Sequence, residues 1–172
     1  MVVKPNSSIL RRLSCLPLIL CLLLAGCGYK LAADQPSIMG DGTKTLKVKG
    51  VDHPTLEPAL PYQLRTALRN EINTRDLAKW VDSGPADYEI QIKVLAYTTR
   101  EWMRSEADKT LLYDSTLSLE ATLYDGKTNQ EIWRSGVISY AERMESPDDK
   151  ALAGDIITQV TRRLADKLRT AF

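Results

Sequence analysis

The sequence predicts an α+β domain, a two-layer sandwich in which a mostly antiparallel sheet of about four strands packs against two helices. Long runs alternate apolar and polar residues, and two other segments, one early and one at the C-terminus, repeat apolar residues at helical spacing. The expected order is β-α-β-β-β-α. Alternation of this kind buries one face of a sheet and leaves the other open, and two amphipathic helices can cover the buried face.

The first strand and the first helix follow one another in the chain. In residues 45–51 (TLKVKGV) apolar residues alternate with lysines, which predicts a strand with one buried face. In residues 56–75 apolar side chains recur at helical spacing, at Leu60, Leu64, Ala67, Leu68 and Ile72. Pro58 and Pro61 both suit a first helical turn, and the sequence leaves open which of them stands at the first helical position.

Strands are expected between the two helices. Residues 77–81 indicate a short strand, ended by the turn residues DSGP. Two long runs follow, 86–97 and 111–124. The first run carries Tyr88, Ile90, Ile92, Val94 and Ala96 on its apolar face, and the second carries Leu117, Leu119, Ala121 and Leu123. Asp-Gly-Lys at 125–127 then turns the chain into a strand over 131–140 (EIWRSGVISY).

The C-terminal segment is the clearest helix. Ser146 suits the N-cap, Pro147 the first helical position and Asp149 the third, where an acid also suits the helix dipole. Apolar residues then repeat every fourth position, at Leu152, Ile156, Val160, Leu164 and Leu168.

The N-terminus is typical of a bacterial lipoprotein. Lys4, Arg11 and Arg12 precede an apolar run over 13–25, which is shorter than the about 20 residues of a membrane span and predicts a secretory signal peptide. Leu-Ala-Gly before Cys27 predicts a lipobox: cleavage before Cys27, a diacylglycerol on its thiol and an N-acyl chain on its amine. Two or more chains anchor a protein stably to a membrane. The expected parts are a signal peptide (1–26), an acylated N-terminus and tether (27–43) and one sandwich domain (44–172).

Charge and cysteine content exclude several classes of function. Cleavage removes three of the 23 Lys and Arg residues and none of the 22 acids, so the mature chain is slightly acidic and no nucleic-acid partner is expected. Cys15 and Cys21 leave with the signal peptide and Cys27 takes the lipid, so no disulfide is expected.

No constellation of residues predicts catalysis. His53 is the only histidine and has no nucleophile or orienting partner near it in the chain, so we interpret it as a solvated loop residue. Asp148 and Asp149 could pair with Asp82 as acids, but the first two are explained by the helix start. Glycine-rich phosphate loops, Gly-x-Ser-x-Gly and His-Glu-x-x-His are absent from the sequence. We expect no enzyme, no metal site and no cofactor beyond the acyl groups.

One segment between the two longest runs combines apolar and basic side chains. Residues 100–109 (REWMRSEADK) place Trp102 among Arg100, Arg104 and Lys109, a combination that suits a phosphorylated lipid. The alternative is a hairpin end with Trp102 packed on the domain and its charges solvated, as the three acids of the segment favour. Lys93, on the polar side of the preceding run, carries the same ambiguity.

Short motifs in a fixed order make the chain resemble the LPS-assembly lipoproteins, LptE. They are Cys-Gly-Tyr-x-Leu at 27–31, Leu-Glu-Pro-x-Leu at 56–60 before the helix motif x-Leu-x-x-Ala-Leu-Arg-x-Glu at 63–71, Ala-Asp-Tyr at 86–88 and Glu-Ile-Trp at 131–133. The resemblance continues into the C-terminal helix and covers nearly all of the mature chain.

The resemblance implies a helix–sheet sandwich that sits as a plug inside the β-barrel LptD at the outer membrane, on its periplasmic side. There it would help the barrel fold and help lipopolysaccharide reach the cell surface. Family members are thought to contact lipopolysaccharide through basic residues, and Lys93, Arg100, Trp102, Arg104 and Lys109 are the candidates here. The alternative is an outer-membrane lipoprotein that regulates a periplasmic peptidoglycan synthase or an exporter, which the short tether disfavours.

Overall fold

The computed structural model describes residues 38–54, 57–104, 110–145 and 150–170, all within the compact unit Pro36–Phe172. Its elements in chain order are β1 (Thr45–Asp52), α2 (Leu60–Thr74), β2 (Lys79–Trp80), β3 (Tyr88–Arg104), β4 (Thr110–Asp125), β5 (Glu131–Arg134), β6 (Ile138–Met144) and α3 (Lys150–Arg169). The α+β class with two helices is confirmed. The short strand expected over 77–81 is present as β2.

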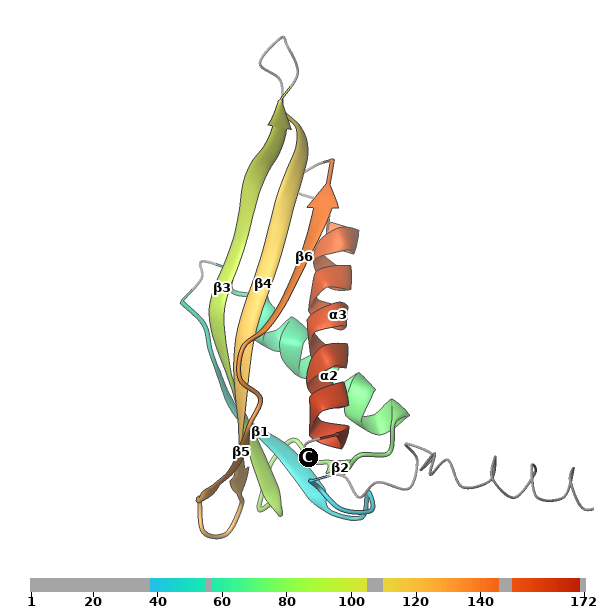
Figure 1. The fold of residues 1–172 in the computed structure, drawn as a ribbon. Helices are drawn as coiled ribbons and strands as arrows, with labels where there is room; N and C mark the ends of the chain where they lie inside the picture. The colour runs from blue at the N-terminus through green and yellow to red at the C-terminus, as the bar shows by residue number, and fades with distance from the viewer. Residues whose placement is uncertain (1–37, 55–56, 105–109, 146–149, 171–172) are drawn as a thin grey trace, which may run out of the picture. The chain divides into compact units, whose positions relative to one another are not determined.

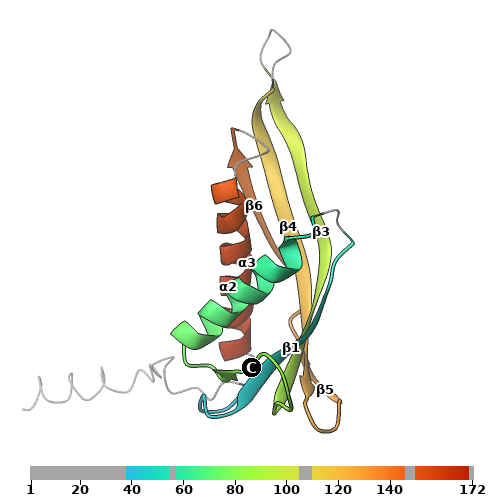
Figure 2. The ribbon, with the colours of Figure 1, turned by 180° about the vertical axis from the view of Figure 1, so that it is seen from behind.

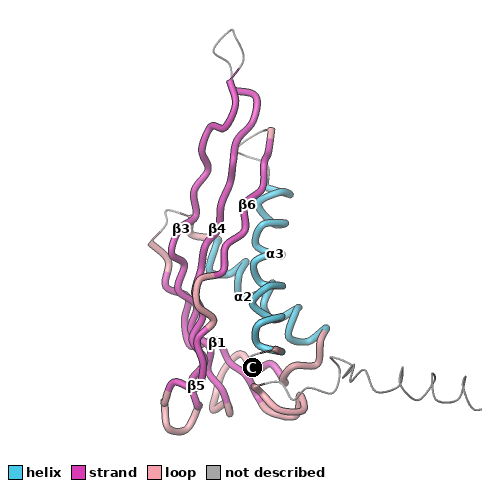
Figure 3. Tube along the Cα trace, viewed as in Figure 1, coloured by secondary structure: helices cyan, strands magenta, loops and turns pink. Residues whose placement is uncertain are grey.

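The strands form one mixed sheet in the order β2-β1-β3-β4-β5, and β6 pairs with the edge of β4 that also holds β5. β3 and β4 lie side by side along their whole length, antiparallel (Figures 1 and 3). β1 is parallel to both β2 and β3, because the chain crosses back through α2 before β3 begins. The antiparallel half of the sheet was expected, whereas the parallel half and the number of strands differ from the expectation.

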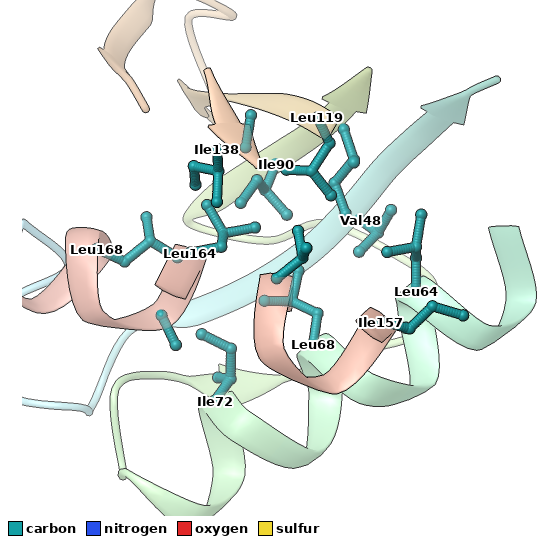
Figure 4. Packing of buried hydrophobic residues seen from close by; sticks show 14 of the residues in the cluster. Val48, Leu64, Leu68, Ile72, Ile90, Leu119, Ile138, Ile157, Leu164 and Leu168 are labelled. Carbon is teal, nitrogen blue, oxygen red and sulfur yellow. The ribbon is translucent and has the colours of Figure 1, made fainter. Parts of the chain in front are cut away.

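Both helices cover the same face of the sheet (Figures 1 and 2). Their expected stripes are buried: Leu60, Leu64, Leu68 and Ile72 in α2, and Ile156, Val160, Leu164 and Leu168 in α3. Figure 4 shows several of them packed with residues of the sheet such as Val48, Ile90 and Leu119; the labelled helix residues of these stripes are Leu64, Leu68, Ile72, Leu164 and Leu168. Met39, in the stretch expected to be a tether, is also fully buried in this core.

Neither proline stands at the first helical position of α2, which is Leu60. The N-cap is Ala59, without a side-chain capping bond, and Pro61 lies in the first turn, where its missing N–H leaves no helical bond unmade. Pro58 therefore precedes the helix.

The prediction of which β3 residues share the apolar face is wrong in the middle of the strand. Ala96 was placed with Val94 on the apolar face, but Leu95 forms a bulge, with Val94 opposite Leu119 and Ala96 opposite Ser118. An extra residue shifts the side-chain alternation by one. Ala96 therefore lies on the face away from the helices, and Tyr97 packs against the core instead.

The single strand expected over 131–140 is interrupted. Residues 135–137 separate β5 from β6, and Gly136 has a φ of 62°, outside the extended region. The Ser135 hydroxyl accepts the Ala121 N–H at 2.9 Å and donates to the Gly136 carbonyl at 2.6 Å. The break lets two short strands share one edge of β4.

The segment 100–109 is not a loop throughout, since β3 continues to Arg104 and β4 begins at Thr110. Several expectations lie outside the described residues: the signal peptide, the Cys27 acylation site, Lys109, and the N-cap at Ser146 with Pro147. The side chain of Leu152 is likewise not described.

Candidate functional site

The ends of β3, β4 and β6 form a strand ribbon that continues past the end of β1 (Figure 1). β1 pairs with β3 only as far as Asp52 opposite Lys93, whereas β4 accompanies β3 to Arg104. On its other edge β4 pairs with β6 from Leu119 opposite Ile138 to Tyr113 opposite Met144. We call the part of this ribbon formed by residues 95–104, 110–116 and 141–144 the ribbon end.

A charged row crosses the ribbon end. Arg100 on β3 lies opposite Asp114 on β4, which lies opposite Arg143 on β6. Directly opposed residues share one face of a sheet. Ile138 and Tyr140 pack on the core, so the alternation along β6 puts Arg143, and with it the whole row, on the face away from the helices. One carboxylate between two guanidinium groups leaves a net positive charge.

Trp102 lies beside this row. It is the extra residue of a second register shift, between Glu101 and Met103, and its side chain is 46% exposed. The guanidinium carbon of Arg143 stands 3.9 Å from the centre of its ring. A cation–π pair at an exposed site contributes about 0.5–1 kcal/mol. Trp102 and Met103, which is 42% exposed, together add exposed apolar surface beside the cations of the charged row.

The candidate residues do not form one cluster. Arg100 and Trp102 lie together at the ribbon end, and Arg104 pairs with Glu101 on the same strand. Lys93 lies about 20 Å away along the strand, opposite Asp52 and Glu120. Sequence reasoning missed Arg143 as a candidate. It lies some forty positions after Arg100 in the chain, and only its place in an alternating run could have indicated which face it occupies.

Several other cations of the open face are paired. Lys47 forms a 2.8 Å ion pair with Glu89, and Lys49 bonds Asn129 and stands 4.5 Å from the ring centre of Tyr124. Arg134 bonds Glu131 at 2.8 Å, and this hydrogen bond lowers the pKa of the Glu131 carboxyl. These cations have partners within the sheet, so this part of the face offers little free charge to a ligand.

Asp82 and His53, the other described candidates for catalysis, do not form a catalytic arrangement with each other. Asp82 accepts the Trp80 indole N–H at 2.9 Å, which is the main reason its pKa is lowered, with Arg65 and Arg69 adding to the effect. His53 is exposed after β1. Across the described residues, no group of three or more His, Cys, Asp or Glu is arranged to hold a metal ion, and no helix is long and apolar enough to cross a membrane.

A shallow groove of about 280 Å³ lies between α2 and α3. It is lined by small or polar residues such as Ala67, Gly154 and Thr158, with Tyr62 at its side. The groove has no charged cluster that would select a ligand.

The described residues form a two-layer domain with a charged open sheet face and a strand ribbon that carries basic and aromatic side chains. The chain belongs to the lipopolysaccharide-assembly family LptE, whose family model matches residues 43–172. The resemblance seen in the sequence motifs is thereby confirmed. No curated protein matches the chain.

Solved structures share the fold at low identity. Uncharacterized lipoprotein B from Nitrosomonas europaea is 17% identical, with 84% of this chain and 92% of that chain covered and a TM-score of 0.57. A protein from Xanthomonas campestris is 18% identical, covering 72% and 81%, with a TM-score of 0.54. PelC from Paraburkholderia phytofirmans, a dodecamer, is 12% identical, covering 76% and 93%, with a TM-score of 0.50. At these identities the likeness concerns the fold alone.

Proposed function

We propose that this protein is a non-catalytic outer-membrane lipoprotein that acts as plug and folding partner of the LptD β-barrel in lipopolysaccharide assembly. The observation that carries the proposal is the family match over the whole domain. The architecture is compatible with it, because the open sheet face and the ribbon end offer polar surface to a partner while the helices enclose the core. Unlike an enzyme, such a protein needs no converging catalytic groups.

The proposal includes a lipid anchor at Cys27, exposed after removal of residues 1–26. Intact-mass analysis of the purified protein should find an N-terminal Cys27 with three acyl chains. The Cys27→Ser variant should keep its signal peptide and lose the acyl mass. An unmodified cysteine in the wild-type protein would contradict the anchor.

A pulldown of the acylated protein from its native membranes in mild detergent tests the partner. We expect a stoichiometric large outer-membrane β-barrel among the co-purifying proteins. Depletion of the chain should leave that barrel misfolded and the cells permeable to large antibiotics. Recovery of a periplasmic synthase or an exporter, with normal barrel levels after depletion, would replace the proposal by the regulatory alternative.

Lipopolysaccharide contact is proposed at the ribbon end. Arg100 and Arg143 supply cations for phosphate groups, and Trp102 supplies apolar area for acyl chains. Arg104 and Lys109 belong to the same proposal. Lys93, nearer the N-terminal end of β3, would make a separate contact.

Photo-crosslinking tests this contact. p-Benzoylphenylalanine in place of Trp102 should crosslink to lipopolysaccharide in intact cells. The matched control is the same group in place of Tyr62, an equally aromatic position that is 74% exposed on α2. Equal crosslinking at both positions would mean that the ribbon end has no special affinity for the lipid.

A further inference from the structure

Parts of the edges of the sheet are short or covered by side chains. β2 has only two residues, Lys79 and Trp80, and so presents a very short edge. On β6 and the segment before it, α3 covers outward-facing carbonyls: Arg163 donates to the Ser139 oxygen and Lys167 to the Ser135 oxygen, both at 2.7 Å. Side chains that occupy edge carbonyls prevent another strand from pairing there.

Among the described residues, no strand pairs with the outer edge of β3 from Val94 to Arg100. β1 pairs with β3 only up to Lys93, because Pro54 ends β1 and proline has no N–H to donate. Within the described parts of the chain, no backbone or side-chain hydrogen bond reaches this edge from outside the β3–β4 pair. Figures 1 and 2 show β3 above the end of β1 with no strand on its outer side.

The directions of the backbone groups on this edge follow from the pairing of β4. The N–H and the carbonyl of Ala121 both bond to Ser135, on the side of β4 away from β3. Every second residue of a strand points the same way, so Leu117 and Ser115 also point away from β3. Tyr97 and Thr99 lie opposite these two and therefore direct their own N–H and carbonyl groups outward.

This outward edge is regular and long enough for a strand. Its register with β4 is unbroken from Ala96 to Arg100, after the bulge at Leu95. Residues 94–100 contain no lysine or proline, which are common protections of an edge. Arg100 is exposed and has no ion pair among the described residues, so an incoming strand could offer it a carboxylate.

We propose that an extended segment of the barrel partner adds as a strand to β3 beside residues 94–100 and presents an acidic side chain to Arg100. This inference rests on the proposed function, and when the barrel strand engages Arg100 the contact with lipopolysaccharide phosphate is left to Arg143. A second copy of the same edge fits less well, because residues 94–100 contain no acid to face Arg100. A lipid lacks donors and acceptors at strand spacing. Main-chain bonds to Tyr97 and Thr99 would supply affinity, and the Arg100 contact would set the register.

Residue-resolved hydrogen exchange on the acylated wild-type protein, alone and in the complex recovered with its barrel, tests the inference. In the free protein the amides of Tyr97 and Thr99 should exchange fast, while those of Thr98 and Arg100 are protected by β4. In the complex the Tyr97 and Thr99 amides should slow by about tenfold or more, as a new hydrogen bond in a buried edge requires.

A matched pair of variants tests the same bond through recovery of the barrel. Thr99→Pro removes the outward N–H without removing a donor to β4. Thr99→Ala keeps the N–H and removes the γ-methyl and the hydroxyl, which contacts Ser115 at 3.2 Å. We expect Thr99→Pro to lower barrel recovery about tenfold and Thr99→Ala to leave it within about twofold. Thermal unfolding of both variants checks that they fold, and the exchange measurement needs no variant.

The outcomes separate this inference from the proposed function. If the barrel co-purifies but Tyr97 and Thr99 exchange as fast as in the free protein, strand addition is wrong and the plug proposal stands. If no barrel co-purifies, both fail. Protection of the two amides in a self-associated form of twice the mass, or by lipopolysaccharide vesicles alone, would identify a different occupant and overturn the assignment.

Discussion

Gly126 offers a direct test of how the base of the sheet is closed. A Cβ atom at this position would lie 1.9 Å from the Ala86 carbonyl oxygen and 2.9 Å from its carbon. The Gly126 N–H donates to the Asp87 carbonyl at 2.8 Å, and the Asp125 carboxylate accepts the Lys127 N–H at 2.9 Å. The first bond holds the turn against the start of β3, so the turn cannot move away without breaking it, and the second bond fixes the shape of the turn itself.

Gly126→Ala should therefore destabilise the fold by steric overlap. The carbonyl oxygen must retreat by more than 1 Å, judged from ordinary contact distances of about 3 Å or more, and the bond to Asp87 is lost with it. Overpacking of about 2 kcal/mol and a hydrogen bond of about 1 kcal/mol together give about 3 kcal/mol. For a domain of this size that lowers the melting temperature by about 10 °C.

Thermal unfolding of the mature protein in detergent, followed by circular dichroism, measures this effect. The matched control is Gly154→Ala in α3, where a Cβ meets nothing within 4 Å. Because alanine favours a helix interior over glycine, the control should gain about 0.5–1 kcal/mol. A Gly126→Ala protein that melts within about 2 °C of wild type would refute the argument from close backbone approach.

Three further predictions concern the core, acid stability and the ribbon end. Leu68→Ala, at a fully buried position in α2, should cost about 3 kcal/mol in urea unfolding, and a loss below about 1 kcal/mol would mean that the site collapses around the cavity. Asp87 accepts the Thr45 N–H at 3.0 Å, and this bond is the main reason that the pKa of the Asp87 carboxyl is lowered in the folded state. The ionised carboxyl therefore stabilises the fold at pH values above its pKa in the unfolded chain, and this stability is lost as the pH falls through its lower pKa in the folded state. Asp87→Asn should flatten this acid limb of the stability profile, and an unchanged limb would assign acid unfolding to other carboxyls. Arg143→Gln should lower stability by no more than about 1 kcal/mol, because its contact with Trp102 is exposed, yet should weaken crosslinking of lipopolysaccharide at position 102. Unchanged crosslinking would remove Arg143 from the proposed contact.

The local periodicity of apolar residues was sufficient to predict the two helices and most strands of the sheet. The stripes ending at Ile72 and Leu168 could be recognised because a helix brings every third or fourth residue to one face, whatever it packs against. The apolar face of β4 was equally readable, since its alternation from Leu117 to Leu123 is unbroken. These features depend on neighbours within one element.

The positions that sequence reasoning missed depend on pairing between elements. The bulge at Leu95 exchanges the faces of Ala96 and Tyr97, and it is visible only in the register against β4. The break at Gly136 separates two strands that pair with one edge of β4, and it is visible only in that pairing. Met39 is buried by a core assembled from residues far along the chain, and its own surroundings in the sequence carry no periodic signal.

The sequence by itself determined the α+β class, both helices, the family and the presence of Arg100 and Trp102 in one basic and apolar segment. Only the tertiary structure decided that Arg143 joins them, that Lys93 lies apart, and that no strand among the described residues pairs with the outer edge of β3 from Val94 to Arg100. The physical reason is that side-chain periodicity is a local property, whereas register and edges arise from hydrogen bonds between strands distant in the chain.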